Sequence, residues 1–393
     1  MNQVRTALIG FLAACLAAIA CLTVWPAFHD PVVWTPDALY YQARLLEIRG
    51  ASHDEAFARV FEGPLSEELR ARDPRHSGNR AWVEYNEPFY ERRVAVPLAG
   101  AALHPLAGDR SLLYISLAGY VAAVAAVFGL LLLRFGVWIA APVAAATLVL
   151  PPLRSHASFP LTDSWGLALE VAAFAMALLA LDRGRRWLIP WAGVIALLAF
   201  TRDTTWIPIA AVGWCALRYR SRIAGMLLAT GVSAALPAIL LFEAPVRNLL
   251  ALLVNDSDVS TDTSWTFIVT HYPGALVELV RADIGFLRRG EWYTAAYFVV
   301  GIVALFLLVR RKPERLGPAG TLLTAGAVVG VAYVLAAPVF SAFRLELALV
   351  PMAAFGLALA IEAVAASVRA RAVERPRSAS HGGRATARSS PPG

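Results

Sequence analysis

The sequence predicts an all-α fold, a polytopic transmembrane helical bundle of about ten spans. The chain of 393 residues is 58% hydrophobic and 16% charged, and its mean hydropathy is +0.59. This charge content is low for a soluble protein and ordinary for a membrane protein. The apolar runs are long enough to cross a membrane, and their arginine-rich ends alternate with ends that carry acids and histidines. The chain is therefore predicted to cross the membrane repeatedly.

Ten apolar runs are the predicted spans, judged against the ~20 residues that a helix needs to cross the hydrocarbon core. They cover residues 6–27, 111–133, 136–152, 164–181, 187–200, 204–217, 223–242, 292–309, 317–337 and 346–368. The fifth and sixth runs are short and could form a hairpin that does not cross fully. Either alternative leaves an even number of crossings, so both termini are expected on one side.

The charges at the span ends predict the orientation. Short loops rich in arginine stay in the cytoplasm, so both termini are expected to be cytoplasmic, in the cell inner (plasma) membrane. Much of the net charge of +7 lies in these loops and in a basic tail, and it needs no nucleic-acid partner.

Residues 1–368 are predicted to form the transmembrane domain. The tail, residues 369–393, is rich in Ser, Pro, Gly and Arg and is expected to be disordered.

The first apolar run also has the features of a signal peptide, since Arg5 precedes it. Its length of about 20 residues is long for the apolar part of a signal peptide and is right for a span. The sequence therefore favours an uncleaved first helix over a signal peptide.

Two predicted outward segments, residues 28–110 and 243–291, are too long to be simple connections, and such loops are usually functional. In the first, Thr35–Asp37 has the pattern of a helix start, and Ser52–Glu55 has the pattern of a capping box. A third piece, residues 94–106, is apolar but too short to cross. We expect short helices here, the last of them lying in the membrane interface.

Asp37 is the strongest candidate for catalysis. It follows the first span in residues 34–41 (WTPDALYY), whose aromatic residues, Tyr40 among them, are typical of the membrane interface. A carboxylate at this depth could accept a proton from an acceptor hydroxyl. The alternative is an acid that only stabilises the positive end of its own helix.

A second group of charges precedes the predicted interfacial helix. Glu87 and Glu91 lie beside Arg92 and Arg93 among aromatic residues. Paired guanidiniums suit the phosphate oxygens of an anionic lipid head group. The alternative is a solvated charge cluster with internal salt bridges.

Further charged residues lie at predicted outer ends of spans. Asp163 opens the fourth span, where capping by Thr162 and the helix dipole explain an acid. Arg202 and Asp203 lie between the two short spans and could pair with each other, although a buried pair would still need a reason.

Arg344 lies at the outer, N-terminal end of the last span. A cation there opposes the helix macrodipole, so capping does not explain it. A bound anion such as a phosphate would explain it. The alternative is a salt bridge to Glu346 or to an acid in an outward loop.

The sequence does not indicate a metal or nucleotide site. His156 and His271 are lone histidines in outward segments, with no second histidine at ligand spacing. The chain has no Walker motif, no dinucleotide-binding glycine fingerprint and no Gly-x-Ser-x-Gly elbow.

The order of these segments resembles the GT-C superfamily of integral-membrane glycosyltransferases. The resemblance is to the polyprenyl-phosphate-sugar-dependent group, which includes protein O-mannosyltransferases and lipid A aminoarabinose transferases. It covers most of residues 1–368 by arrangement more than by one diagnostic string. The segments that carry it are 34–41 (WTPDALYY), 91–98 (ERRVAVPL), 160–163 (PLTD), 201–204 (TRDT) and 343–345 (FRL).

The resemblance implies a function and a set of roles. The donor would be a polyprenyl-phosphate-linked sugar within the membrane lipids, and the acceptor an envelope lipid, glycan or protein. Asp37 would be the catalytic base or a metal ligand, and Arg344, Arg202 and Arg92 would bind the donor phosphate. The supporting or acceptor side would comprise Asp163, Asp203, Glu87, Glu91, Tyr40 and His271.

The chain also departs from the superfamily. Asp37-Ala38-Leu39 is not the acid pair of several branches, and the chain has neither a Trp-Trp-Asp-Tyr-Gly motif nor a soluble C-terminal domain. No cofactor is therefore implied with certainty, and a divalent cation stays an open alternative.

Two other functions stay open. A transporter or flippase of a lipid-linked anion would use the same outer arginines, but would also place charges at the bilayer midplane. Glu170 and Glu362 are the nearest to such charges, and each can be placed close to a span end. A catalytically inactive scaffold for envelope assembly is the third alternative. The enzyme hypothesis predicts that Asp37 and Arg344 lie within roughly 15 Å of each other, in one cavity that is open both to lipid and to the outside.

Overall fold

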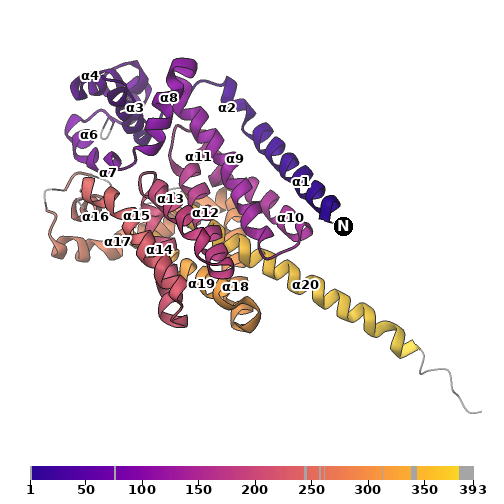
Figure 1. Cartoon of the computed structure of the whole chain (residues 1–393). Helices are drawn as coiled ribbons and strands as arrows, with labels where there is room; N and C mark the ends of the chain where they lie inside the picture. The colour runs from indigo at the N-terminus through magenta and orange to yellow at the C-terminus, as the bar shows by residue number, and fades with distance from the viewer. Residues whose placement is uncertain are drawn as a thin grey trace, which may run out of the picture.

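A computed structural model describes residues 2–74, 77–242, 246–255, 258–260, 262–311, 313–337 and 343–379. Every regular element in this part of the chain is a helix, as the composition predicted. In Figure 1 most helices of the first long loop gather at the upper left, and the last helix, α20 (Val350–Ala379), extends from the bundle to the lower right.

In the part of the chain that the structure describes, seven stretches are long and apolar enough to span a membrane, and a bent helix pair would make eight. The chain is therefore a multi-pass membrane protein. The first six stretches lie in α1 (Asn2–Thr23), α8 with α9 (Ala95–Ala107 and Ser111–Leu132), α12 (Asp163–Arg183), α15 (Arg222–Leu241), α18 (Trp292–Arg311) and α19 (Pro313–Ala336). The seventh consists of the helical turn Glu346–Leu349 and most of α20 (Val350–Ala379).

The bent pair consists of α10 (Val137–Leu148) and α11 (Pro151–Ala157), which meet at 59°. Pro151 begins α11, and Leu150 before it has an extended backbone. A residue that precedes proline is disfavoured in the helical region, so the helix breaks at this point.

The two short predicted spans form α13 (Leu188–Ala199) and α14 (Trp206–Tyr219), of 12 and 14 residues. By length alone both are short of the ~20 residues needed to cross. They are not tightly paired with each other: α13 packs against α12 and α15, whereas α14 packs against α15 and α19. A single helical turn, Asp203–Thr205, joins them.

The last helix is longer than predicted. It continues past residue 368 to Ala379, so the first part of the predicted tail is helical, which agrees with the high helix propensity of its alanines and arginines. The rest of the predicted tail, residues 380–393, lies outside the described residues.

The first long loop contains more helices than predicted. They are α2 (Trp25–His29), α3 (Pro36–Ile48), α4 (His53–Phe57), α5 (Glu67–Arg72), α6 (Arg80–Asn86) and α7 (Pro88–Glu91). Both predicted helix starts are confirmed. Thr35 Oγ1 accepts a hydrogen bond from the Ala38 amide at 3.3 Å, and Ser52 and Glu55 form a reciprocal capping box.

These loop helices have a small core of their own. Leu39, Tyr41 and Leu45 of α3 pack with Phe57 and other apolar residues of the loop. The same core includes Leu112 of α9 and Leu161, which precedes α12. The loop is therefore anchored on the ends of two membrane helices.

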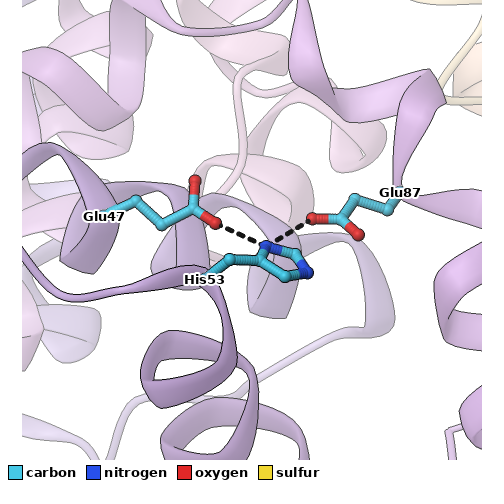
Figure 2. Close-up of side chains that lie close together, drawn as sticks. All are labelled: Glu47, His53 and Glu87. Atoms are coloured by element: carbon cyan, nitrogen blue, oxygen red, sulfur yellow. Dashed lines mark hydrogen bonds and ion pairs between the residues drawn. The ribbon is translucent and has the colours of Figure 1, made fainter.

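A histidine ties the loop helices together (Figure 2). His53 Nδ1 lies 2.8 Å from Glu47 Oε1 near the end of α3 and 3.4 Å from Glu87 Oε1 before α7. The hydrogen bond to Glu47 is the main cause that raises the pKa of His53 above its ordinary value. These residues form the one group of three metal-ligand types within 4.8 Å of one another that the described chain contains. A protonated imidazole between two carboxylates explains why these three side chains lie close together.

The second long loop contributes α16 (Val246–Val254) and α17 (Trp265–Phe286), which pack against each other. Both lie at the left of Figure 1, beneath the first-loop helices. Tyr85 of α6 donates a hydrogen bond to the Asn248 carbonyl at 3.1 Å, which links the two loops.

Candidate functional site

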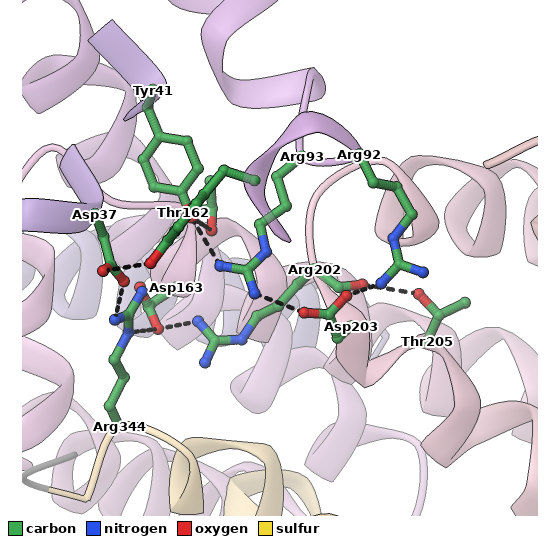
Figure 3. Close-up of polar contacts among 11 residues, drawn as sticks. Asp37, Tyr41, Arg92, Arg93, Thr162, Asp163, Arg202, Asp203, Thr205 and Arg344 are labelled. Carbon is green, nitrogen blue, oxygen red and sulfur yellow. Dashed lines mark hydrogen bonds and ion pairs between the residues drawn. The ribbon is translucent and has the colours of Figure 1, made fainter. Parts of the chain in front are cut away.

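Five segments far apart in the sequence bring charged side chains to one place, where the loop core meets the membrane helices (Figure 3). They are the first turn of α3, the residues after α7, the first residue of α12, the turn between α13 and α14, and the residues before α20. The side chains are Asp37, Arg92, Arg93, Asp163, Arg202, Asp203 and Arg344, and we call this set the charge network.

Asp37 and Arg344 are in direct contact, although 307 positions separate them. Arg344 Nη1 donates a hydrogen bond to Asp37 Oδ2, and the Tyr90 hydroxyl donates one to Asp37 Oδ1 at 2.7 Å. The predicted proximity of the acid and the arginine is therefore found, whereas the cavity that they would share stays a prediction. Of the two salt bridges considered as alternatives to a bound anion, the one to Glu346 is not among the ion pairs of Arg344 in the described structure. The one to an acid of a long loop is present, since Asp37 lies in the first long loop.

Asp163 is shared by two arginines. Arg344 Nε donates to Asp163 Oδ1 at 2.6 Å, and Arg202 Nη1 donates to the same oxygen. Asp163 is only 2% exposed. The capping interpretation is wrong for Thr162, whose side chain makes no cap hydrogen bond; its hydroxyl lies 3.3 Å from the Tyr41 hydroxyl. Asp163 is instead the buried junction of the network.

Asp203 joins the other two arginines. Arg93 Nη2 donates to Asp203 Oδ2 at 2.6 Å, and Arg92 forms an ion pair with Asp203 Oδ1. Arg93 Nη1 also donates to the Tyr41 hydroxyl at 2.9 Å, and its guanidinium lies over the Tyr90 ring. Neighbours Arg202 and Asp203 therefore have different partners, and they do not form the pair considered from the sequence.

A glycine makes room for Arg202 on the surface of α12. A Cβ atom added at Gly166 would lie 2.5 Å from Arg202 Cδ, which is closer than real Cβ contacts. The aliphatic part of Arg202 therefore packs directly against the α12 backbone, one turn after Asp163, and this contact directs its guanidinium to the Asp163 carboxylate.

The charge network has a net positive charge, because its four guanidiniums exceed its three carboxylates by one. Its edge is partly accessible: the Asp203, Asp37 and Arg344 side chains are 33%, 22% and 19% exposed. An excess cation at an accessible edge attracts an anion, and guanidiniums suit the oxygens of a phosphate.

The resting state of Asp37 is set by its partners. Burial alone would raise the pKa of this carboxyl, but the charge of Arg344, the Tyr90 hydroxyl and the charge of Arg93 together hold the pKa below its ordinary value. Burial and the negative charge of Asp37 raise the pKa of Tyr90 well above its ordinary value. Asp37 is therefore ionised, and Tyr90 is neutral and able to donate a hydrogen bond.

The implied alternative of a metal at Asp37 does not fit this arrangement. Both oxygens of Asp37 already accept hydrogen bonds, one from a guanidinium and one from a phenol. A divalent ion at Asp37 would also need a neighbourhood that tolerates a second positive charge. The adjacent Arg344 opposes this.

Four predicted supporting residues lie outside the charge network. Tyr40 stacks on Tyr90 with ring centroids 4.3 Å apart, and its hydroxyl donates to the Val83 carbonyl. Glu87 and Glu91 line a pocket together with His53 and these two tyrosines. His271 is exposed on α17, where its ring contacts Phe267.

Three residues that bond to the acids of the candidate site or lie between them were not among the site residues predicted from the sequence: Arg93, Tyr41 and Tyr90. Tyr41 had a usable signal, since a residue four positions after Asp37 lies on the same face of a helix. Arg93 was visible beside Arg92, but the pattern does not show that it is the more connected of the two. For Tyr90 the sequence offers no signal beyond the cluster of aromatic residues.

An apolar cavity lies next to the charge network. It has a volume of about 180 Å³ and is lined by α8, α9, α12 and α13. Trp165 and Thr201 in its lining are close in sequence to Asp163 and Arg202, and Ala95 lies two residues after Arg93. An apolar chain in this cavity would therefore have its polar end near the guanidiniums.

A scan of protein-family models and a search of curated protein sequences found no match to this chain.

Proposed function

We propose that this chain is a GT-C-type membrane glycosyltransferase, which moves a sugar from a polyprenyl-phosphate donor to an envelope lipid, glycan or protein. The observation that carries the proposal is the contact between Asp37 and Arg344 inside one charge network. Transfer of this kind is helped by a carboxylate that accepts the proton of the acceptor hydroxyl and by guanidiniums that stabilise the leaving phosphate. Both are present together near the ends of the membrane helices.

The proposed topology places this network outside the cytoplasm. In it α13 and α14 complete ten spans, the arginine-rich loops and both termini face the cytoplasm, and the membrane is the plasma membrane. Donor and acceptor would then meet on the extracytoplasmic face.

Donor binding follows from charge and shape. The excess guanidinium charge attracts the donor phosphate, which Arg344 can bind through two N–H groups, with Arg202 and Arg92 nearby. The apolar cavity beside Trp165 suits part of a polyprenyl chain. The acceptor would approach the partly exposed side of Asp37.

The donor would also activate the base. A carboxylate whose pKa is held low by Arg344 is a weak base. A donor phosphate competes with Asp37 for Arg344. As the guanidinium turns to the phosphate, burial becomes the dominant influence, and the pKa of Asp37 rises. Asp37 would therefore become a stronger base only when donor is bound.

The chemical step is a displacement at the anomeric carbon. The acceptor hydroxyl oxygen forms a bond to this carbon and gives its proton to Asp37. The bond from the carbon to the phosphate oxygen breaks, and polyprenyl phosphate leaves with the electron pair. Arg344, Arg202 and Arg92 stabilise the charge that develops on the leaving phosphate.

The test is transfer and donor cleavage by the purified protein in liposomes with a labelled polyprenyl-phosphate sugar. Loss of a general base typically costs roughly 10²–10⁴-fold in rate, so Asp37→Asn should lose that much. Arg344→Ala should lose roughly 10²–10³-fold. The matched control is Asp182→Asn, whose carboxylate pairs with Arg134 away from the network. Full activity of Asp37→Asn would remove the base assignment.

One observation favours the transporter alternative. Glu170 lies within the candidate span α12 and is only 1% exposed, and intramembrane acids often mark transport pathways. Release of polyprenyl phosphate that depends on donor distinguishes the enzyme from a flippase or an inactive scaffold. Movement of intact labelled donor between leaflets, stopped by Glu170→Gln, would instead support transport.

A further inference from the structure

Helix α17 is incompletely covered by the rest of the protein. It has 22 residues, yet only Ile268 and Leu279 are buried. It belongs to the second long loop and is not among the candidate spans, which end before it at Leu241 and resume at Trp292. Most side chains of α17 are therefore packed neither in the protein core nor in a candidate span.

The uncovered side of α17 carries an apolar stripe. At 3.6 residues per turn its members fall on one face of the helix, next to the buried face. All are exposed, up to 66% for Val269. The members are Trp265, Val269, Val277, Val280 and Ile284.

Beyond the apolar stripe, the water-facing side of the helix is polar. Arg281 and Glu278 lie there, and both are largely exposed. Arg288 and Arg289 follow directly after the helix. A helix with basic residues on one face and tryptophan and aliphatic residues on another is typical of a membrane interface.

Two contacts of α17 place it at the level where membrane helices end. The Tyr272 hydroxyl donates a hydrogen bond to the Leu335 carbonyl near the end of α19. The Phe286 ring lies 5.6 Å from the Phe343 ring, just before the last candidate span. The chain then leads through Glu291 into α18. Three candidate spans therefore begin or end beside α17.

We infer that α17 lies in the membrane interface on the Arg344 side, with its apolar stripe among lipid acyl chains, and that this position holds Arg344 in place. The ligand class is phospholipid. Continuity with the ends of three candidate spans favours lipid over a protein partner, because the helix then lies at head-group depth and its stripe can reach the acyl chains. Arginines beside a membrane surface also attract anionic lipid head groups.

The link to Arg344 runs through its neighbour. Phe343 has a left-handed backbone with φ of 62°, which is a rare conformation for a bulky residue. Such a conformation persists only when surrounding contacts hold it. Phe343 is 8% exposed, and the Phe286 ring is one of the groups that cover it. Displacement of α17 would release this turn and, with it, Arg344 from Asp37 and Asp163.

The test of the lipid contact uses a photo-crosslinking amino acid in the full chain. Benzoylphenylalanine replaces Val280 on the stripe or, as a matched control, its neighbour Arg281 on the polar side. The protein is reconstituted in liposomes of phosphatidylcholine and phosphatidylglycerol and irradiated, and adducts are identified by mass spectrometry. Lipid adducts at position 280 and few at 281 are expected. Equal lipid labelling, or adducts with a second copy of the chain or another protein at 280, would overturn the inference.

The test of the coupling compares thermal unfolding in the same liposomes. Phe286→Ala and Arg344→Ala should each lower Tm, and the double variant should lower it by less than the two losses together, because neighbouring groups couple. Phe286→Tyr retains the aromatic ring, so its Tm should equal that of the wild type. Additive losses would overturn the positioning of Arg344. Neither test uses the sugar donor, so both can succeed even if the proposed transfer reaction fails.

Discussion

Arg344 Nε lies 2.6 Å from Asp163 Oδ1, although the two residues are 181 positions apart. The same oxygen accepts a hydrogen bond from Arg202. One buried carboxylate therefore joins the entry to the last helix, the start of α12 and the turn between α13 and α14. The positions of the arginines proposed to bind phosphate depend on this carboxylate.

Asp163→Asn should strongly destabilise the protein. The amide retains the shape of the side chain but removes the charge, which leaves two guanidiniums close together without their shared anion. Removal of one partner from a buried ion pair typically costs about 3–5 kcal/mol. Thermal unfolding in liposomes or detergent measures the loss. Asp182→Asn removes an ion pair whose partners are 30% and 36% exposed, and it should cost under about 1 kcal/mol. Equal losses for the two variants would contradict the role of Asp163 as a junction.

Gly166→Ala should displace Arg202 without any change of charge. The new Cβ would lie 2.5 Å from Arg202 Cδ and 3.1 Å from its Cβ, so Arg202 or helix α12 must shift. Overpacking of this kind typically costs about 1–3 kcal/mol. A Cβ at Gly193, on α13, meets nothing within 4 Å, and alanine is the better helix former there. Gly193→Ala should therefore be neutral or stabilising in the same unfolding assay. A neutral Gly166→Ala would show that the Arg202 contact is not tight.

The His53 bridge predicts a dependence of stability on pH. The pKa of His53 is raised in the folded state, so its stabilising effect is complete below the ordinary histidine pKa of about 6.5 and is lost as pH rises through the higher folded value. Arg44 also pairs with Glu47, and the His53 side chain is 54% exposed, so the effect should be under about 1 kcal/mol.

His53→Gln should remove this pH dependence, as measured by Tm between neutral and mildly alkaline pH. His271→Gln is the control, since His271 is an exposed residue of α17 outside the bridge. If His53→Gln keeps the wild-type slope, another group is responsible for the pH dependence.

The local features of the fold could be predicted, because their causes are local. The helix starts at Thr35 and Ser52 depend on a side chain and an amide three residues apart. The apolar runs depend only on composition. The short helices α5, α6 and α7 could not be found in this way, since 4 to 7 residues are too few to show a helical period.

The candidate site could be predicted only in part. Arg344 was identified because a cation at a helix N-terminus is unfavourable without a partner. Its partners could not be identified, because Asp37 and Asp163 approach it only in the tertiary fold. Asp163 was misinterpreted for a related reason: a sequence shows that a helix start can be capped, and it does not show that a distant arginine reaches the same carboxylate.

Arg93→Lys should separate geometry from charge in the second half of the network. Arg93 uses two N–H groups in different directions, one to the Tyr41 hydroxyl and one to Asp203, and its plane lies over Tyr90. A lysine keeps the positive charge but lacks the planar fork, so it can hold one of these partners at a time. The lost hydrogen bond in a site only 17% exposed should cost about 1–2 kcal/mol in thermal unfolding. Arg80→Lys, on an arginine 62% exposed, should change stability by less than about 0.5 kcal/mol. Equal losses of stability in Arg93→Lys and Arg80→Lys would mean that Arg93 acts as a point charge. The planar guanidinium would then have no part in holding Tyr41 beside Asp37.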